Sequence, residues 1–339
     1  MKAWLYTSTA GGLEKNLHLD PQARMPGALR DDQILVKVIS ASLNPADYKV
    51  TELGGWGTVS KVVVPRPATP GMDFCGRVVI AAPSVKDVKR GQLVYGTIGI
   101  PSQFGSMGEY LITKASTTAP LPDGLDPDDA AAVGVAAQTA YQSVVPYVSR
   151  GDNVFINAGS GGCGIFAIQM AKLLGCQVTT TCSTQNAEFC KSLGADEVID
   201  YTVEDVVAVL KGKGQVFDHV VDHMGTPEAL YRECDAFLRP GKAFVQVGGP
   251  VSTFADRLVR PSFLGGGKRK YVILLFKNRK EEVVQIGEWI RQGKIKVVID
   301  STFELDDAVK AIERLKTSRS RGKIIIHVSN KETSSGGQE

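Results

Sequence analysis

A glycine-rich turn near the middle of the chain joins an apolar β-type segment to a helical one. Residues 159–164 read GSGGCG and separate the strand-like NVFIN from the helix-like GIFAIQMAKLLG. Glycines at this spacing permit a tight turn and let the backbone approach a pyrophosphate, which the first N–H groups of the helix then bind. Such turns also occur for steric reasons alone, but the β–α alternation around this one favours a dinucleotide site. Its candidate residues are Gly159, Ser160, Gly161, Gly162, Cys163 and Gly164.

The next β-type segment, QVTTTC, ends without a carboxylate. A NAD site usually has Asp or Glu about 20 residues after the turn to bind the ribose hydroxyls. A carboxylate there would repel the 2′-phosphate of NADPH, whereas hydroxyl and amide groups can donate to it. The segment is followed instead by Ser183, Thr184, Gln185 and Asn186, and Tyr201 could add a phenol donor. These four residues also suit a helix N-cap, but the pattern favours NADPH over NADH.

Two kinds of patterning divide the chain. Up to about residue 113, short β-type segments separated by Pro and Gly predict a β-rich body. From residue 151, β-type and helical segments alternate, which is typical of a parallel sheet with helices on both faces. The last β-type segments suggest that the C-terminus returns to the first domain. We therefore predict a β-rich domain at 1–125 completed by 296–330, a nucleotide-binding α/β domain at 126–295, and a flexible tail at 331–339.

The composition is that of an ordinary soluble protein. Of the 339 residues, 43% are hydrophobic and 22% are charged, and the net charge of +3 predicts neither a nucleic-acid nor a membrane surface. The six cysteines form no CxxC pair, which indicates free thiols in a reducing compartment. No signal peptide and no apolar run of about 20 residues is visible, so we expect a cytosolic protein.

Several longer stretches match a known pattern in order along nearly the whole chain: SLNPADYK, PGMDFCGRVV, AAQTAYQSV, the glycine turn, KSLGADEVIDY, LRPGKAFVQVGG and RGKIII. In these stretches the chain resembles the medium-chain dehydrogenase/reductases, in the zinc-free quinone-oxidoreductase branch. Within that branch it is most similar to alkenal/enone reductases, chloroplast-envelope quinone-oxidoreductase homologues and fungal enoyl reductases. The resemblance implies a GroES-like β domain and a Rossmann-type doubly wound domain, with cofactor and substrate in the cleft between them.

The resemblance also locates the positions that hold a catalytic zinc ion in the alcohol dehydrogenases of the superfamily. Asn44 and Met72 occupy the first two, and the third falls around Val135. An amide, a thioether and an aliphatic side chain cannot form a tetrahedral zinc site, and the four-cysteine structural lobe is missing too. His219 and His223, four residues apart on a strand, would lie about 13 Å from each other. We therefore expect no metal.

Without zinc, an acceptor activated by its own conjugation is easier to reduce than an alcohol is to oxidise. Hydride from NADPH would add to an α,β-unsaturated carbonyl or a quinone, and hydrogen-bond donors and a proton source would complete the reaction. The resemblance places Lys49 beside cofactor and substrate, with Asn44 donating to the substrate oxygen or the nicotinamide ribose and Tyr48 as a candidate proton source. The alternative for SLNPADYK is a Pro-containing turn with solvated charges.

Further cofactor contacts are implied by the resemblance alone, and each of these residues could instead be structural: Thr139, Gly248, Gly249, Gly322 and Lys323. The segment GGGKRKYVILLF (265–276) could be a substrate flap, a membrane-surface contact, a dimer interface or a solvated loop. Three functions remain open: an NADPH-dependent reductase of free enones or quinones, a trans-acting enoyl reductase of a biosynthetic synthase, and a non-catalytic NADPH-binding structural or sensor protein. We expect a homodimer, with a monomer as the alternative.

Overall fold

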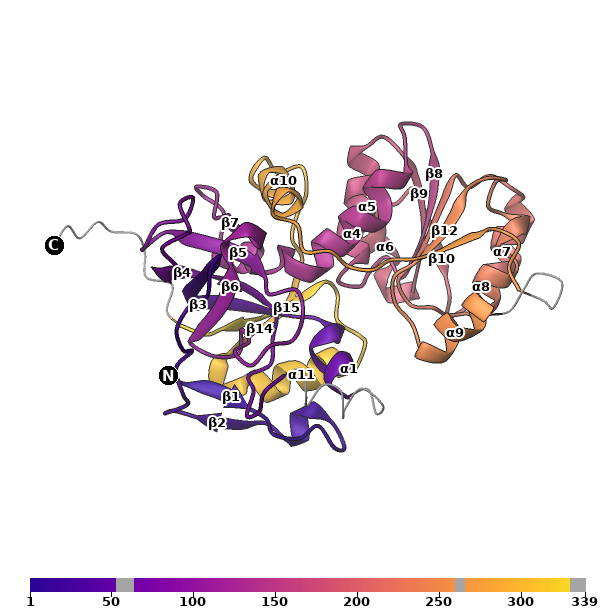
Figure 1. Ribbon diagram of the computed structural model, residues 1–339. Coiled ribbons are helices and arrows are strands. Elements are labelled where there is room, and N and C mark those ends of the chain that lie inside the picture. Colours follow the sequence, from indigo (N-terminus) through magenta and orange to yellow (C-terminus); the bar gives the residue numbers. More distant parts are fainter. Residues whose placement is uncertain (53–63, 260–265, 330–339) are drawn as a thin grey trace. The chain divides into compact units, whose positions relative to one another are not determined.

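The computed structural model describes residues 1–52, 64–259 and 266–329, and the chain forms two compact units (Figure 1). Unit 1 comprises residues 1–135, 278–291 and 299–339, and unit 2 comprises residues 136–277 and 292–298. The first is built on an antiparallel and mixed β-sheet and the second on a parallel one. The expected fold class is therefore confirmed. The predicted tail at 331–339 lies outside the described residues.

The strands of unit 1 form a two-stranded and a seven-stranded sheet. The small sheet pairs β1 (Ala3–Leu5) with β2 (His18–Asp20). The large sheet has the order β14-β15-β3-β4-β5-β7, with β6 also paired to β3. Its strands are β3 (Gln33–Leu43), β4 (Asp73–Ala81), β5 (Leu93–Thr97), β6 (Tyr110–Lys114), β7 (Thr118–Pro120), β14 (Ile299–Glu304) and β15 (Lys323–His327).

The C-terminal strand β15 pairs with β3, so the end of the chain does complete the first sheet as the β-type return suggested. The helices of this unit are α1 (Pro45–Glu52), α3 (Pro127–Ala131), α10 (Lys280–Arg291) and α11 (Ala308–Lys316). Helix α11 packs on the core through Ala308, Ala311, Ile312 and Leu315. Their i, i+3, i+4, i+7 spacing is the apolar face of an amphipathic helix.

Two helices belong to unit 1 although the sequence placed residues 126–295 in the nucleotide-binding domain. Helix α3 is bound to the sheet because Ser40 Oγ donates to Asp128 Oδ1 at 2.5 Å, and His327 Nε2 lies 3.0 Å from Asp128 Oδ2. Helix α10 is bound through Tyr95, whose hydroxyl donates to the carbonyl of Val283 at 2.8 Å. The boundary between the units thus follows residue 135 rather than residue 125.

Unit 2 is a six-stranded parallel sheet in the order β10-β9-β8-β11-β12-β13. Its strands are β8 (Asn153–Asn157), β9 (Gln177–Cys182), β10 (Glu197–Asp200), β11 (His219–Asp222), β12 (Ala243–Gln246) and β13 (Lys270–Ile273). The order reverses between β8 and β11. The carboxyl ends of the strands at such a reversal are where open α/β sheets bind their ligands.

Helices cover both faces of this sheet (Figure 1). They are α4 (Gln138–Val144), α5 (Gly164–Leu173), α6 (Ala187–Ser192), α7 (Val206–Lys213), α8 (Ala229–Arg232) and α9 (Val251–Val259). One core is aromatic: the rings of Phe155 and Phe217 pack edge to face at 5.8 Å, and those of Phe217 and Phe237 at 6.4 Å. No helix among the described residues is long and apolar enough to cross a membrane.

Candidate functional site

Four polar side chains meet in the interior of unit 1, and we call Asn44, Asp47, Asp73 and Lys323 the Asn44 cluster. None of them is more than 4% exposed. Asn44 follows β3, Asp73 begins β4 and Lys323 begins β15, and both β4 and β15 pair with β3 at this end. Asp47 comes from the first turn of α1. Strand register therefore brings together residues that lie far apart in the sequence.

The side-chain amide of Asn44 is bound at both ends. Its Nδ2 donates to Asp73 Oδ2 at 2.7 Å, and its Oδ1 accepts from the Lys323 ammonium at 2.6 Å. The ammonium also donates to the carbonyl of Leu43 at 2.9 Å and lies 3.7 Å from Asp73 Oδ2. These contacts fix the orientation of the amide and leave one Nδ2 hydrogen for a further acceptor.

A single ammonium in this cluster faces two carboxyl groups. Burial, together with the negative charge of Asp73, raises the pKa of Asp47 to about 7. Burial also raises the pKa of Asp73, while Lys323 and the Asn44 amide oppose that shift. Asp47 Oδ2 accepts from the Asn44 backbone N–H at 2.6 Å, and its Oδ1 is buried without a hydrogen-bond partner. The cluster is electrically neutral when Asp73 is ionised and Asp47 keeps its proton.

Tyr48 and Lys49 follow on α1. The Lys49 side chain is exposed, and Tyr48 is half-buried against the core of unit 1. The ammonium of Lys316 lies 5.0 Å from the centre of the Tyr48 ring and 2.6 Å from Glu52 Oε1. Burial raises the pKa of the Tyr48 phenol, so it stays protonated at neutral pH and can act as a hydrogen-bond donor, as an acceptor or as a weak acid.

Each residue at the three zinc positions is buried or hydrogen-bonded within unit 1. Asn44 is held as described, the side chain of Met72 is buried, and the backbone N–H of Val135 donates to Asp73 Oδ1 at 2.9 Å. Within residues 1–52, 64–259 and 266–329, no group of three or more His, Cys, Asp and Glu side chains could hold a metal ion. His219 begins β11, and its ring is stacked on Tyr147; burial lowers its pKa to about 4.

The glycine turn lies between β8 and α5, as the motif requires. A Cβ added at Gly159 would lie 2.2 Å from Thr180 Oγ1, and one at Gly164 would lie 2.2 Å from the carbonyl of Ala158. Both glycines are therefore required for close packing. A Cβ at Gly161 would meet nothing nearer than 3.7 Å, so the backbone there is open to a ligand. Cys163 is the N-cap residue of α5, and in the first turn of that helix the N–H of Ile165 donates to the carbonyl of Gly161 at 3.0 Å. The turn fits a bound diphosphate.

Donor groups after β9 connect to this turn. Asn186 Nδ2 donates to Ser160 Oγ and to Ser183 Oγ, each at 3.3 Å. Because both hydroxyls accept from the amide, each can direct its own hydrogen to an anionic ligand. Thr184 and Gln185 lie with Asn186 in a short 3-10 turn, and Tyr201 follows β10 and is 49% exposed. The structure therefore connects the polar residues after β9, at positions 183–186, to the glycine turn in unit 2.

Sequence reasoning missed Asp200, the last residue of β10. Its carboxylate accepts from the Thr202 N–H at 2.9 Å and from the Thr202 hydroxyl at 2.6 Å. Hydrogen bonds from Thr184 and Thr202 lower the pKa of this carboxyl group. The NAD motif predicts an acid at the end of β9, whereas Asp200 ends the neighbouring strand β10, opposite Cys182. The hydroxyl of Thr184 is thus partly committed to Asp200.

Sequence reasoning also missed a buried network at the carboxyl ends of β8 and β11. Asn157 Nδ2 donates to Asp222 Oδ1 at 2.8 Å, and Asn157 Oδ1 accepts from the Thr181 hydroxyl at 2.7 Å. The Thr181 oxygen in turn accepts from the N–H of Ala158, the residue before the glycine turn, at 2.8 Å. The signal in the sequence was a polar residue at or next to the end of each of three strands, which no motif names.

The residues implied by resemblance alone are divided between the units. Gly322, which has φ 88°, and Lys323 are in unit 1. The Lys323 side chain is buried and bound to the Asn44 cluster, so it is not a solvated lysine. Thr139 is a buried residue of α4, and Gly248 and Gly249 follow β12 in unit 2.

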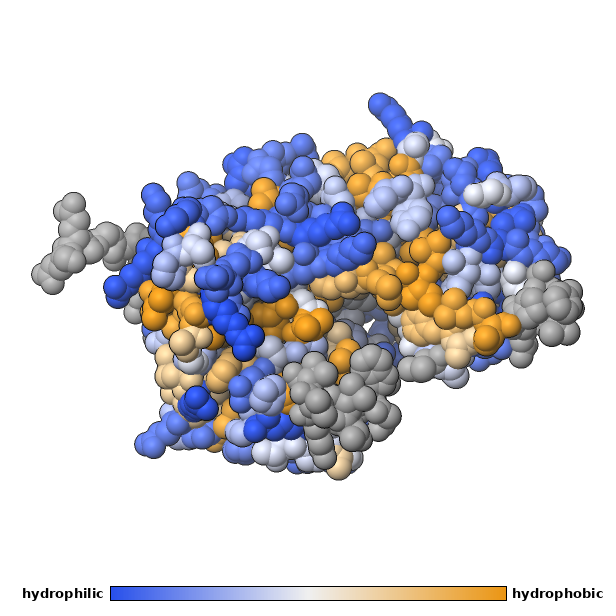
Figure 2. All heavy atoms as spheres, in the orientation of Figure 1, coloured by the Kyte–Doolittle hydropathy of each residue, from blue (hydrophilic) through white to orange (hydrophobic). Residues whose placement is uncertain are grey.

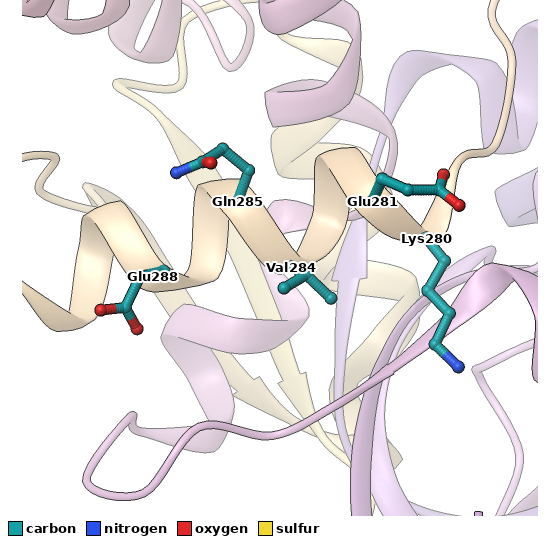
Figure 3. Close-up of a pocket in the computed structure, with 5 residues that line it drawn as sticks. All are labelled: Lys280, Glu281, Val284, Gln285 and Glu288. Atoms are coloured by element: carbon teal, nitrogen blue, oxygen red, sulfur yellow. The ribbon is translucent and has the colours of Figure 1, made fainter. Parts of the chain in front are cut away.

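Two other features lie apart from these groups. Residues 270–273 of the segment 265–276 form β13, the edge strand paired with β12, and residue 265 lies outside the described residues. A hollow of about 460 Å³ on unit 1 is lined by five residues of α10 (Figure 3): Lys280, Glu281, Val284, Gln285 and Glu288. It contains none of the candidate site residues.

A GroES-like β unit with a Rossmann-type unit that carries a glycine turn defines a dinucleotide-binding dehydrogenase or reductase. Two family models match: "Alcohol dehydrogenase GroES-like domain" over residues 30–123 and "Zinc-binding dehydrogenase" over residues 193–326. A trans-enoyl reductase of Aspergillus terreus is 44% identical over 97% of this chain and 96% of its own length. An NADPH-dependent alkenal/one oxidoreductase of Arabidopsis thaliana is 31% identical, over 96% of this chain and 79% of its own.

The crystallised quinone oxidoreductase of Coxiella burnetii is 32% identical and superposes with a TM-score of 0.85, over 97% of this chain and 99% of its own. The chain therefore belongs to the medium-chain dehydrogenase/reductase superfamily, in its quinone-oxidoreductase branch, and is an oxidoreductase.

Proposed function

We propose that this protein is a zinc-independent reductase that uses NADPH to reduce a conjugated acceptor, either the C=C bond of an α,β-unsaturated carbonyl or a quinone. The observation that carries the proposal is the joined set of donors around the glycine turn, in which Asn186 links Ser160 to Ser183 and no carboxylate ends β9. The names of the relatives support the acceptor class and the cofactor.

The cofactor site is assigned to unit 2. The open backbone at Gly161 and the first N–H groups of α5 bind the diphosphate, and Ser160 and Ser183 donate to the 2′-phosphate. Tyr201 and Gln185 are further candidates for that phosphate. When bound, NADPH supplies the hydride of the reaction. Thr139, Gly248 and Gly249 stay candidates for contacts to the nicotinamide half.

The residues that act on the acceptor are assigned to unit 1. Lys49 is exposed on α1, so its ammonium is available to stabilise negative charge on the substrate oxygen. Asn44 donates its remaining Nδ2 hydrogen to the substrate oxygen or to the nicotinamide ribose, with its direction set by Lys323 and Asp73. Tyr48 is the candidate proton donor. We assign Lys323 to positioning Asn44 rather than to contacting the cofactor.

A substrate panel tests this function. NADPH oxidation should be followed with 2-alkenals, alkyl vinyl ketones and quinones, and NADP⁺ reduction with simple alcohols. We expect turnover of conjugated acceptors and none of the alcohols. Robust alcohol oxidation would contradict the proposal, and so would NADPH binding without turnover of any acceptor, which would favour a structural or sensor role.

A second candidate is a trans-acting enoyl reductase, because one relative with that name is 44% identical over almost the full length of both chains. This candidate shares the chemistry and differs in the carrier of the substrate. An enoyl chain presented as a free ketone, as a short thioester and on a carrier protein distinguishes the two. A kcat/KM that rises steeply only on the carrier protein would support the second candidate. We also propose a cytosolic homodimer, which size-exclusion chromatography with light scattering and cell fractionation would test.

A further inference from the structure

Helix α9 buries a charged side chain and exposes two hydrophobic ones. Its Arg257 is 6% exposed, whereas Leu258 is 65% and Val259 is 78% exposed, and hydrophobic side chains are visible on the surface of unit 2 (Figure 2). Arginine is among the residues least often buried, and burying its charge is costly unless the charge is paired. The interior of unit 2 must therefore provide compensating partners for this guanidinium.

The hydrogen-bond partners of Arg257 lie at the carboxyl edge of the parallel sheet. Arg257 Nη1 is 3.2 Å from Asp222 Oδ2 at the end of β11 and also donates to the side-chain carbonyl of Gln246 at the end of β12. Its Nη2 donates at 3.4 Å to the carbonyls of Gly225 and Glu228 in the loop after β11. The guanidinium lies 5.5 Å from the centre of the Phe244 ring. A flat fork with several donors suits this set, and a lysine could not satisfy it.

The other oxygen of Asp222 extends the network to the nucleotide-binding turn. Asp222 Oδ1 accepts from the N–H groups of Met224 at 3.0 Å and Gly225 at 2.8 Å, and from Asn157 Nδ2 at 2.8 Å. Asn157 ends β8, and only Ala158 separates it from the glycine turn. One buried ion pair thus joins the loops that follow β8, β11 and β12, on both sides of the point where the strand order reverses.

We propose that Arg257 is a positioning residue for the cofactor, which acts through Asp222 to hold these loops in the geometry that binds the dinucleotide. It need not touch the ligand. This inference rests on the proposed use of NADPH, because that cofactor is assigned to the carboxyl edge of the sheet, where this network joins the loops. The inference gives α9 a role in cofactor affinity that no sequence motif predicts.

A role in cofactor affinity must be separated from a role in stability. Arg257→Met alone leaves a buried, unpaired carboxylate, which is strongly destabilising in itself. The double variant Arg257→Met/Asp222→Asn removes both charges, and the new amide keeps an accepting oxygen for Asn157 and the backbone N–H groups. We expect the double variant to regain much of the thermal stability lost by the single one. Its affinity for NADPH should stay low, because Arg257 no longer joins the end of β12 to the loop after β11.

A second Arg–Asp pair, at the opposite end of the same strand, supplies a control. Arg239 Nη1 lies 2.7 Å from Asp218 Oδ1, and Asp218 directly precedes β11 at the amino edge of the sheet. Arg239→Met breaks an Arg–Asp pair away from the proposed site, although the Arg239 side chain is 47% exposed and Lys242 Nζ also lies 3.8 Å from Asp218 Oδ1. We expect it to lower the melting temperature without changing NADPH affinity. Arg257→Lys, which keeps the charge but not the fork, should recover stability more fully than affinity.

The test is the Kd for NADPH by calorimetry in wild type and these variants, with the melting temperature measured on the same samples. We expect the double variant to bind NADPH about tenfold more weakly than wild type, a difference of about 1.4 kcal/mol. A double-variant Kd within twofold of wild type would overturn the inference alone, since the wild type would still bind. A wild type that binds no NADPH would overturn the proposed function and the inference with it. If Arg257→Met does not fold, the double variant and Arg257→Lys decide the question.

Discussion

Replacing Asp47 with asparagine should make the stability of the protein less sensitive to alkali. Asp47 shares a buried cluster with Asp73 and one ammonium, that of Lys323, and its pKa is raised to about 7 by burial and by the neighbouring carboxylate. Burial raises the pKa of Tyr6, and the charge of Asp47 raises it further. Asparagine has nearly the same shape as a protonated aspartic acid and cannot ionise.

The size of the effect follows from the shift in pKa. From 3.8 in the unfolded chain to about 7 in the folded protein is a difference of about 3.2 units, and at 1.36 kcal/mol per unit this amounts to about 4 kcal/mol. Because the folded pKa is the higher one, the folded state holds the proton more tightly. The contribution of Asp47 is therefore fully present below pH 3.8, declines as pH rises, and is lost above pH 7.

The assay is chemical denaturation of wild type and Asp47→Asn at several pH values between 5 and 8.5. The free energy of unfolding of the variant minus that of wild type should increase by about 2 to 3 kcal/mol across this range, the part of the linkage that lies within it. The side-chain N–H₂ of the new asparagine can lack a hydrogen-bond partner, which lowers the free energy of unfolding by the same amount at every pH. The measurement therefore compares how the difference changes with pH rather than its absolute value. Titration of Asp73 occurs in both proteins and largely cancels in the difference. A difference that stays constant would show that Asp47 is already ionised at pH 5, and the charge argument for the Asn44 cluster would be wrong.

Three further predictions concern the reaction. Ser183→Asp should reverse the preference from NADPH to NADH by repelling the 2′-phosphate, while Ser183→Ala should only weaken NADPH; a wild type that prefers NADH in calorimetry would contradict the assignment of the donor group. Lys49→Ala should lower kcat/KM for enones by about 10²-fold, the usual effect of losing one preorganised donor, and should change NADPH affinity little. Lys49→Arg should recover part of the lost activity. Unchanged steady-state kinetics in Lys49→Ala would remove Lys49 from the mechanism. Exhaustive chelation should leave activity intact, and one tightly bound zinc ion per chain in elemental analysis would refute the interpretation of Asn44 and Met72.

The local patterns of the sequence were sufficient for the class of fold, the family and the position of the glycine turn. Each depends on residues that are near one another in the chain. The turn from Gly159 to Gly164 is a contiguous motif, and the β–α alternation after residue 151 is a local periodicity. Hydroxyl and amide donors were expected after β9, and the structure joins Ser183 to Ser160 through Asn186.

Contacts between distant residues could not be predicted in the same way. Asn44 and Lys323 are 279 residues apart and meet only because β15 pairs with β3, so neither the fixed orientation of the amide nor the burial of the ammonium was visible in SLNPADYK or RGKIII. Arg257 and Asp222, 35 residues apart, form their ion pair only once α9 packs at the end of the sheet. A sequence shows which side chains carry charge, but the cost of burying a charge and the partner that offsets it depend on strand register and packing. The type of chemistry was therefore set by local motifs, whereas the protonation of Asp47, the orientation of Asn44 and the support of the nucleotide-binding edge were decided by the tertiary structure.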